Sequence, residues 1–425
     1  MLSVHYIQKG LLYTKPPPGD YYELNLINNV LVRLKQSLSI ALLHFYPLAE
    51  SCLSVHYIQK GLLYTKPPPG DYYVTKLDQQ CLGKAQTIPF HCPPSFLSLS
   101  RSACNKNRTK PKVSYSVFVD CKNSPGAKFI HAAVDLSVSD IVSPTYVPLV
   151  VQSFFDHDRA INYDGHTRPL LSIQVTELVD GVFIGCSMNH AIADGTTFWH
   201  FINTLSEIFQ AQGDTKIKIS GSPMLERWFP EGNNGPLLTL PFTHQNEFIT
   251  RFETPHVLER IFHFSAKSIT KLKKRANTES NTTKISSFQS LSAFVWRSIT
   301  RARRLPCEIV TCCMLAINNR SRLEPPLSPN YFGNSFQTVT AMTTAGELLD
   351  HGLGWAAWKL YQAVVNHSDK SVRGYDNDWL RSPFVYQCSP HLYPRIVIIG
   401  SSPRFNMYGN EFGLGKALYT SKWIW

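Results

Sequence analysis

The chain has 425 residues and carries 42 Lys+Arg against 30 Asp+Glu, a formal net charge of +12. Its hydrophobic content of 43% and charged content of 17% exclude a disordered chain, a coiled coil and a collagen-like repeat. No apolar run approaches the roughly 18–20 residues that span a bilayer, so the sequence favours a soluble globular protein of two or three domains.

The first feature in chain order is a duplication. Residues 2–22 and 53–73 carry the same 21 residues, LSVHYIQKGLLYTKPPPGDYY. Solenoid repeats diverge and come in threes or more, so two identical copies indicate a recent duplication or a mispredicted gene rather than a repeat fold. Residues 81–112 follow neither a helical nor a strand period. We therefore predict that 51–73 and 81–112 are intrusive segments.

The first helix is predicted over Asn25 to Leu48, because leucines at positions 31, 34, 38 and 42 share one face. A strand follows from Val113, where apolar and polar residues alternate. Two further strands, Leu170–Leu178 and Val182–Met188, flank a turn that contains Asp-Gly. Together these elements indicate a sheet with helices packed on it.

The segment Asn189 to Gly195 (NHAIADG) comes directly after the second of these strands. A helix is predicted after it, with inward side chains at positions 198, 202, 205 and 209. This order places His190 at the end of a central strand, where open α/β sheets hold their chemistry.

Residues 213–250 are rich in Gly and Pro and are predicted to be a crossover linker between domains 1–212 and 251–425. The second domain is expected to begin its core with a helix over Ser286–Arg304, which buries Phe288, Leu291, Val295 and Ile299 on one face. It continues with a strand, a long helix and a second strand, over Ile309–Ile317, Leu348–Val365 and Val397–Gly400. Helices between strands on both sides of the linker predict two α/β domains.

His190 is a candidate general base, because a neutral imidazole accepts a proton from a hydroxyl or an amine. A hydrogen-bonded core histidine is the alternative, and Asp194 has one too, as the N-cap of the next helix. Cys186 is expected to pack inside its strand, and Gly185–Asn189 lacks the second glycine of a nucleophile elbow. Asp156–Asp158 has no second ligand cluster, so no metal site is predicted.

Several motifs occur in a characteristic order. NHAIADGTTFW resembles the HxxxD signature of the plant BAHD acyl-CoA-dependent acyltransferases, and Asn410–Lys416 (NEFGLGK) resembles that family's DFGWG motif. Asn318–Arg322 and Tyr331–Asn334 match its N-x-R-x-R and YFGN segments, and Ser286–Arg304 resembles its SSFxxLxAxxWR helix. The resemblance implies a two-domain chloramphenicol-acetyltransferase-like fold, with mixed β-sheets flanked by helices and an active-site channel at the domain interface.

The resemblance also implies a mechanism. His190 would act as general base while an acyl group moves from acyl-CoA to a hydroxyl or amine of a plant specialised metabolite. Asp194 would pair with Arg320 and orient the histidine turn, and Gly413 and Gly415 would be structural. The phosphates of CoA, a co-substrate rather than a bound cofactor, would suit basic residues. The candidate CoA contacts are Ser287, Arg297, Arg301 and Lys416.

The sequence departs from the family pattern in several places. Glu411 replaces the usual Asp, and Leu414 replaces a Trp and removes an indole N–H. The chain is expected to start within the family's first helix, so that an N-terminal strand is missing. It is also expected to lack core strands after Lys416. The alternative functions are therefore a lyase or hydrolase that uses the same histidine pocket and a catalytically inactive product of a duplicated or mispredicted gene.

The remaining expectations concern partners and location. The basic residues are densest at 271–275 and 297–304, where a solvated helix face is the simplest interpretation, ahead of a phosphate-bearing ligand and then of nucleic acid. The ten cysteines form no CxxC pair, which favours reduced thiols in the cytoplasm. We expect a monomer that binds acyl-CoA and a small acceptor, and neither nucleic acid nor membrane.

Overall fold

The computed structural model describes residues 4–15, 23–49, 52–57, 73–74, 88–89, 115–120, 126–211, 219–230, 242, 247–249, 251, 258–384, 393–400 and 404–423. None of the helices in these ranges is long and apolar enough to cross a membrane. Residues 219–230, 242 and 247–249 of the predicted linker are described, whereas the rest of the linker and most of the two segments predicted to be intrusive lie outside the described residues. The predicted domain limits therefore stay a prediction.

Within the described ranges, the larger sheet has six strands in the order β12-β1-β8-β7-β6-β3, and all neighbours are antiparallel except β6 and β7. Its strands are β1 (Ile7–Thr14), β3 (Tyr73–Val74), β6 (Ala127–Ala133), β7 (Leu171–Glu177), β8 (Gly181–Met188) and β12 (Tyr419–Trp423). The two strands predicted on either side of the Asp-Gly turn are thus confirmed as β7 and β8. Because β8 has a partner on each side, it is an interior strand, as predicted.

The first copy of the repeat forms β1, which contradicts the expectation that the chain begins inside a helix and lacks an N-terminal strand. All eight residues of β1 pair with β8, from Ile7 opposite Met188 to Thr14 opposite Gly181. On its other edge, β1 pairs with β12 near the end of the chain. Seven of the eight residues of β1 are buried, because its side chains pack on both faces of the sheet.

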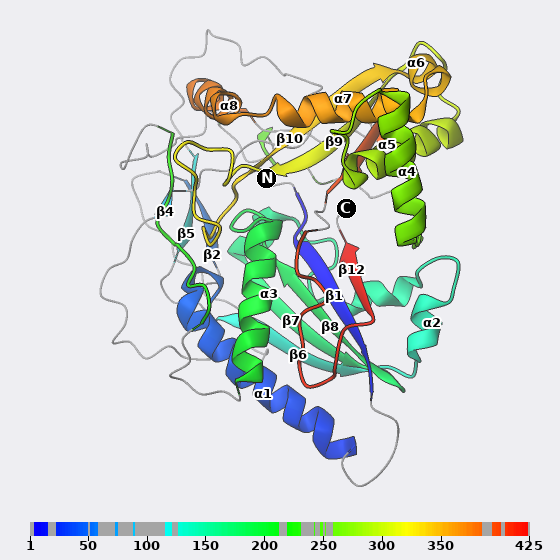
Figure 1. Cartoon of the computed structure of the whole chain (residues 1–425). Coiled ribbons are helices and arrows are strands. Elements are labelled where there is room, and N and C mark those ends of the chain that lie inside the picture. The colour runs from blue at the N-terminus through cyan, green and yellow to red at the C-terminus, as the bar shows by residue number, and fades with distance from the viewer. Residues whose placement is uncertain are drawn as a thin grey trace.

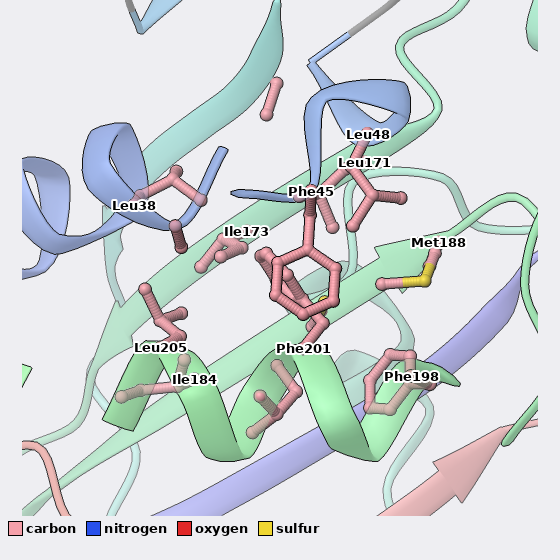
Figure 2. Packing of buried hydrophobic residues seen from close by; sticks show 14 of the residues in the cluster. Leu38, Phe45, Leu48, Leu171, Ile173, Ile184, Met188, Phe198, Phe201 and Leu205 are labelled. Atoms are coloured by element: carbon pink, nitrogen blue, oxygen red, sulfur yellow. The ribbon is translucent and has the colours of Figure 1, made fainter. Parts of the chain in front are cut away.

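Helices α1 (Glu23–His44) and α3 (Gly195–Gln210) cover one face of the larger sheet (Figure 1). The predicted faces are confirmed. The four leucines of α1 and the four inward residues of α3 are at most 7% exposed: Leu31, Leu34, Leu38, Leu42, Phe198, Ile202, Leu205 and Phe209. Figure 2 shows that side chains from the α1 end, α3, β7 and β8 fill one apolar layer.

A second apolar cluster lies on the other face of the same sheet, beside α2 (Val138–Val142). Phe154, Phe155 and Phe183 meet there with ring centroids 5.2–5.5 Å apart. A Cβ atom on Gly185 would lie 2.2 Å from the carbonyl oxygen of Phe154. The glycine in the middle of β8 therefore permits this close backbone approach.

The smaller sheet has the strand order β10-β9-β11 and is formed by residues of the C-terminal half. Its strands are β9 (Val310–Asn318), β10 (Phe336–Thr344) and β11 (Ile396–Ile399), and its helices are α4 (Ala266–Glu279), α5 (Ser287–Arg303), α6 (Ala345–Asp350), α7 (Leu353–Val365) and α8 (Asp369–Arg381). Figure 1 shows these helices gathered around β9 and β10, apart from α1 and α3. The molecule is thus mixed α/β, with its helices flanking two principal sheets.

The buried face of α5 differs from the predicted one. The centre of the face is Ala293 and Trp296, both 0% exposed, and the Trp296 indole donates to Thr311 Oγ1 at 3.2 Å. Phe288, Val295 and Ile299 are half-buried at its edge, whereas Leu291 is not part of the cluster. Serine and threonine side chains, which a hydrophobic pattern ignores, fill the rest of this face.

The helix predicted over Leu348–Val365 is two helices, α6 and α7, which are separated at His351 and Gly352. A Cβ atom on Gly352 would lie 2.5 Å from Glu279 Oε2. Glu279 also accepts the Gly354 N–H at 2.7 Å, in the first turn of α7. The break therefore lets a carboxylate of α4 reach the N-terminus of α7.

A third sheet has the order β2-β5-β4, with β2 at Cys52–Tyr57, β4 at Ile88–Pro89 and β5 at Tyr115–Asp120. β5 confirms the strand predicted after Val113. β2 belongs to the second copy of the repeat, and Tyr73 at the end of that copy pairs with Lys128 at the edge of the larger sheet.

Candidate active site

His190 lies two residues beyond the end of β8, in the turn that leads into α3. Its side chain is at the place predicted from the sequence, and the residue is 6% exposed. The His190 ring faces the ring of Phe336, the first residue of β10, with the centroids 5.6 Å apart. The histidine therefore lies where the larger sheet meets the smaller one.

Asp194 has both of the roles considered from the sequence. As the N-cap of α3, it accepts the Thr197 N–H at 2.9 Å. It also forms an ion pair with Arg320, whose Nη1 lies 2.7 Å from Asp194 Oδ2 and whose Nη2 lies 3.2 Å from Oδ1. Burial raises the pKa of this carboxyl, but the Arg320 charge and the hydrogen bonds from Arg320, Ser335 and Thr197 together outweigh burial and hold the pKa below its ordinary value.

Arg320 extends the network from Asp194 to the YFGN segment. Its Nη2 donates to the carbonyl oxygens of Tyr331 and Gly333, each at 2.9 Å. Thr197 of α3 reaches the same segment, because its hydroxyl lies 3.0 Å from the Gly333 oxygen and accepts the Gly333 N–H at 3.1 Å. These contacts join the start of α3 to the approach to β10.

Asn334 completes the contact between this segment and the histidine turn. Its side-chain amide donates to the carbonyl oxygens of His190 and Ala191, each at 2.9 Å. The next residue, Ser335, donates its N–H to Asp194 Oδ2 at 3.0 Å. The structure thus brings the histidine turn together with the N-x-R-x-R and YFGN segments, both of which follow it by more than a hundred residues in the chain.

The second arginine of the N-x-R-x-R segment has a different role. Arg322 donates to the carbonyl oxygens of Val364, in the last turn of α7, and of His367, just beyond the helix, at 3.1 and 2.8 Å. The His367 ring lies 2.8 Å from Asn319 Oδ1. Burial, together with the Arg322 charge, lowers the pKa of His367 to about 4, so this imidazole is neutral at neutral pH.

The C-terminal glycine motif packs on the far half of α3. Phe412 is 1% exposed and meets Tyr13 and Phe209 edge-on. Ser206 of α3 accepts the Glu411 N–H at 2.9 Å.

Gly413 and Gly415 have φ angles of +73° and +75°, which favour glycine. Leu414, at the position of the usual Trp, is 7% exposed. The motif is therefore built into the core of the larger sheet.

Comparison with known proteins identifies the family. A model of the Transferase family matches residues 108–424. An uncharacterized acetyltransferase of Arabidopsis thaliana is 35% identical over 383 residues, which cover 88% of this chain and 83% of the relative. Shikimate O-hydroxycinnamoyltransferase of Nicotiana tabacum is 30% identical, over 71% of each chain. The chain belongs to the plant BAHD acyltransferase family.

Solved structures agree with the BAHD fold. Vinorine synthase is 20% identical and superposes with a TM-score of 0.61, covering 98% of this chain and 80% of the other. TRI101 of F. graminearum, in complex with coenzyme A and deoxynivalenol, is 15% identical with a TM-score of 0.62, covering 100% and 87%. These likenesses confirm the predicted fold class, and the family membership makes this chain an acyltransferase.

The four residues predicted to contact CoA lie in different settings. Ser287 is the first residue of α5, and Arg301 and Lys416 are exposed. Arg297 instead donates to the carbonyl oxygens of Leu349 and His351 at the end of α6. It is therefore already engaged within the BAHD fold, and the role of all four residues in CoA binding stays a prediction.

Other candidates have structural explanations. Cys186 is 2% exposed inside β8, and burial raises the pKa of its thiol, so it packs as predicted. His157 contacts the Tyr6 ring and the Pro169 carbonyl, and burial lowers the pKa of its imidazole. Asp156 pairs with Lys128 at 3.1 Å. No group of three metal-ligating side chains occurs in the described part of the chain.

Sequence reasoning missed two buried polar residues, Lys9 of β1 and Asn162, which is hydrogen-bonded to His190. Lys9 of β1 is 4% exposed, with Nζ 5.1–5.7 Å from the ring centroids of Phe198, Trp199 and Phe405. Asn162 is 0% exposed and accepts the His190 N–H at 2.7 Å. Lys9 lies in the duplicated segment, for which no strand was predicted. Asn162 contacts His190 from a distant part of the chain, and no local sequence pattern marks such a contact.

Proposed function

We propose that this chain transfers an acyl group from an acyl-CoA thioester to a hydroxyl or amine of a plant specialised metabolite, with His190 as general base. The observation that carries the proposal is the fixed position of His190 at the junction of the two principal sheets. The printed names of two relatives, shikimate O-hydroxycinnamoyltransferase and omega-hydroxypalmitate O-feruloyl transferase, support a hydroxyl acceptor. Structures of TRI101 with coenzyme A support a CoA donor.

Asp194 does not act as a charge partner for His190 in this proposal. Both of its carboxylate oxygens are engaged: Oδ1 with Thr197 and Arg320, and Oδ2 with Ser335 and Arg320. The carboxylate therefore fixes the ends of the turn rather than the His190 ring. This arrangement differs from a hydrolase triad, in which the acid holds the histidine ring directly.

The reaction needs no covalent enzyme intermediate. His190 accepts the proton of the acceptor O–H or N–H while the acceptor atom attacks the thioester carbonyl. The tetrahedral intermediate then collapses, the C–S bond breaks, and the proton passes from His190 to the CoA thiolate. General-base assistance of this kind contributes on the order of 10²–10⁴ in rate. Exposed Arg301 and Lys416 are the candidate contacts for the CoA phosphates in a cytoplasmic, monomeric enzyme.

The test is an assay of the purified chain with acyl-CoA donors and a panel of alcohols and amines. His190→Ala is expected to lower kcat about 10²–10⁴-fold, whereas His263→Ala, an exposed histidine, is expected to leave kcat unchanged. Product formed without CoA dependence would indicate a lyase or hydrolase. Full activity of His190→Ala, or a folded chain that acylates none of the panel, would overturn the proposal.

A further inference from the structure

The main chain of His190 is held by side chains rather than by secondary structure. β8 ends at Met188 and α3 begins at Gly195, so neither a strand ladder nor a helix fixes the peptide groups of His190. Its N–H donates to Asn162 Oδ1 at 2.7 Å, and its carbonyl oxygen accepts from Asn334 Nδ2 at 2.9 Å. Two asparagines thus hold the two main-chain groups of the proposed base.

Asn162 contacts the turn twice. Besides accepting the His190 N–H, it accepts a hydrogen bond from Asn189 Nδ2 at its own carbonyl oxygen, at 2.9 Å. Asn189 Oδ1 in turn accepts the Ala191 N–H at 2.9 Å. Because Asn162 is 0% exposed, water does not replace these bonds when one of them is lost.

Asn162 is itself anchored to the start of the chain. Its N–H donates to the carbonyl oxygen of Val4 at 2.7 Å, and the preceding residue, Ile161, forms a bridge with His5. Asp164 accepts the Ile161 N–H at 3.0 Å and forms an ion pair with Arg251. Asn162, which accepts the His190 N–H, therefore lies in a turn beside β1 that these contacts hold in place.

Asn334 approaches from the opposite direction, in the segment that leads into β10. Its single amide nitrogen donates to two successive carbonyl oxygens, those of His190 and Ala191. A carboxylate at this position has no hydrogen to donate and would face two carbonyl oxygens. The two asparagines consequently have opposite requirements, since position 162 needs an acceptor and position 334 needs a donor.

We propose that Asn162 and Asn334 form an asparagine clamp, a pair of positioning residues that fixes the His190 imidazole relative to both substrates. The clamp rests on the proposed function, because it acts through His190. A buried N–H that loses its acceptor is costly, and displacing a catalytic group by about 1 Å costs on the order of 10²-fold in rate. Loss of the clamp therefore lowers kcat while the acyl-CoA site stays intact.

The experiment exploits the opposite requirements of the two positions. Asn162→Asp keeps an acceptor for the His190 N–H and is expected to retain kcat within about threefold, whereas Asn162→Leu is expected to lower kcat about 10- to 100-fold. Asn334→Asp and Asn334→Leu are both expected to lower kcat by a similar factor. KM for acyl-CoA is expected to stay constant. The acid limb of the pH profile of Asn162→Leu is expected to keep its midpoint, since the substitution removes no charge.

Asn277→Leu is the matched control, because Asn277 of α4 also holds a main-chain segment, accepting from Ile285 N and donating to Ile285 O. It is expected to lower Tm and leave kcat unchanged. Wild-type kcat in Asn162→Leu, or an Asn162→Asp variant as impaired as Asn334→Asp at equal folded fraction, would overturn the clamp. If His190→Ala is inactive in the same assay, such a result refutes the clamp alone and leaves the proposed base in place.

Discussion

Arg320 shows how a single residue couples the two halves of the molecule. It is 2% exposed, and its guanidinium contacts Asp194, Thr197, Tyr331 and Gly333. Burying two charges is expensive, and an ion pair offsets that cost only where further hydrogen bonds satisfy both groups. Here the carboxylate also accepts from two main-chain N–H groups. Removal of either charged partner still leaves the other charge buried without its counter-charge.

We predict that Arg320→Met destabilises the fold by about 3–5 kcal/mol at neutral pH. In the wild type the pKa of Asp194 is held low, so the ion pair contributes stability above the unfolded-state pKa of about 3.9. That contribution is lost as pH falls through the folded-state pKa. Without Arg320, burial raises the pKa of Asp194, and the variant loses stability as pH rises. The difference in unfolding free energy between the wild type and Arg320→Met therefore shrinks toward acid pH.

Denaturant unfolding of both proteins between neutral pH and about pH 3 measures this difference. Arg275→Met is the control, because the Arg275–Glu279 pair is an exposed pair within one helix, of the kind that contributes about 0.3–0.5 kcal/mol. A destabilisation of Arg320→Met that does not change with pH would refute the electrostatic explanation.

At the scale of elements, β1 links both ends of the chain to the histidine strand. It lies between β8, which leads to His190, and β12, which ends at Trp423. Val4, just before β1, holds Asn162. Although residues 2–22 occur twice in the sequence, this copy is thus integral to the larger sheet, and its packing restricts individual side chains.

Gly10 provides a test of that packing. A Cβ atom there would lie 2.0 Å from Cζ of Phe183, a ring that is 0% exposed and packed against Phe154 and Phe155. We predict that Gly10→Ala destabilises the fold by about 1–3 kcal/mol through overpacking, measured by denaturant unfolding.

The duplicated sequence supplies the matched control for Gly10→Ala. Gly61 occupies the same place in the second copy, and the sequence prediction that 51–73 is intrusive expects Gly61→Ala to be neutral. Equal effects of the two substitutions would refute that prediction, and a neutral Gly10→Ala would refute the overpacking argument.

At the scale of the whole molecule, periodic patterns predicted part of the fold, and β1, β6 and β10 were not among the predicted strands. The helix faces of α1 and α3 and the strands β5, β7, β8, β9 and β11 follow from local hydrophobic spacing. The break at Gly352 could not be predicted in the same way, because it depends on Glu279 of another helix. The position of Asn162 beside His190 depends on a contact between separate elements, and no sequence period records such a contact.

The motifs predicted the candidate site better than they predicted the role of each residue. Asp194 and Arg320 meet as the family resemblance implies, whereas Arg297, chosen as a basic residue for CoA, is occupied by carbonyl oxygens at the end of α6. The position of an arginine in the sequence does not show whether its side chain faces solvent or is engaged within the fold. The contribution of the other basic residues to CoA binding must therefore be tested on the intact enzyme.

The net charge of +12 leads to a prediction about the whole enzyme. If the substrate is an acyl-CoA, whose phosphates are anionic, positive potential raises its rate of association, and salt screens that effect over a Debye length of about 10 Å at 0.1 M. We predict that kcat/KM for acyl-CoA falls as salt rises, while kcat and the KM for an uncharged acceptor stay constant. A dephospho-CoA thioester is expected to give a shallower dependence.

Charge reversals distinguish a general field from a local contact. Arg301→Glu, Lys416→Glu and Lys271→Glu change the net charge equally, and all three side chains are exposed. A general field lowers kcat/KM by the same factor in each, whereas a phosphate contact makes the loss larger for Arg301→Glu or Lys416→Glu, the outcome we expect. Steady-state kinetics at two salt concentrations measures both effects. A Lys271→Glu variant as impaired as the other two would remove Arg301 and Lys416 as CoA contacts, and a salt-independent kcat/KM would refute electrostatic attraction of the donor.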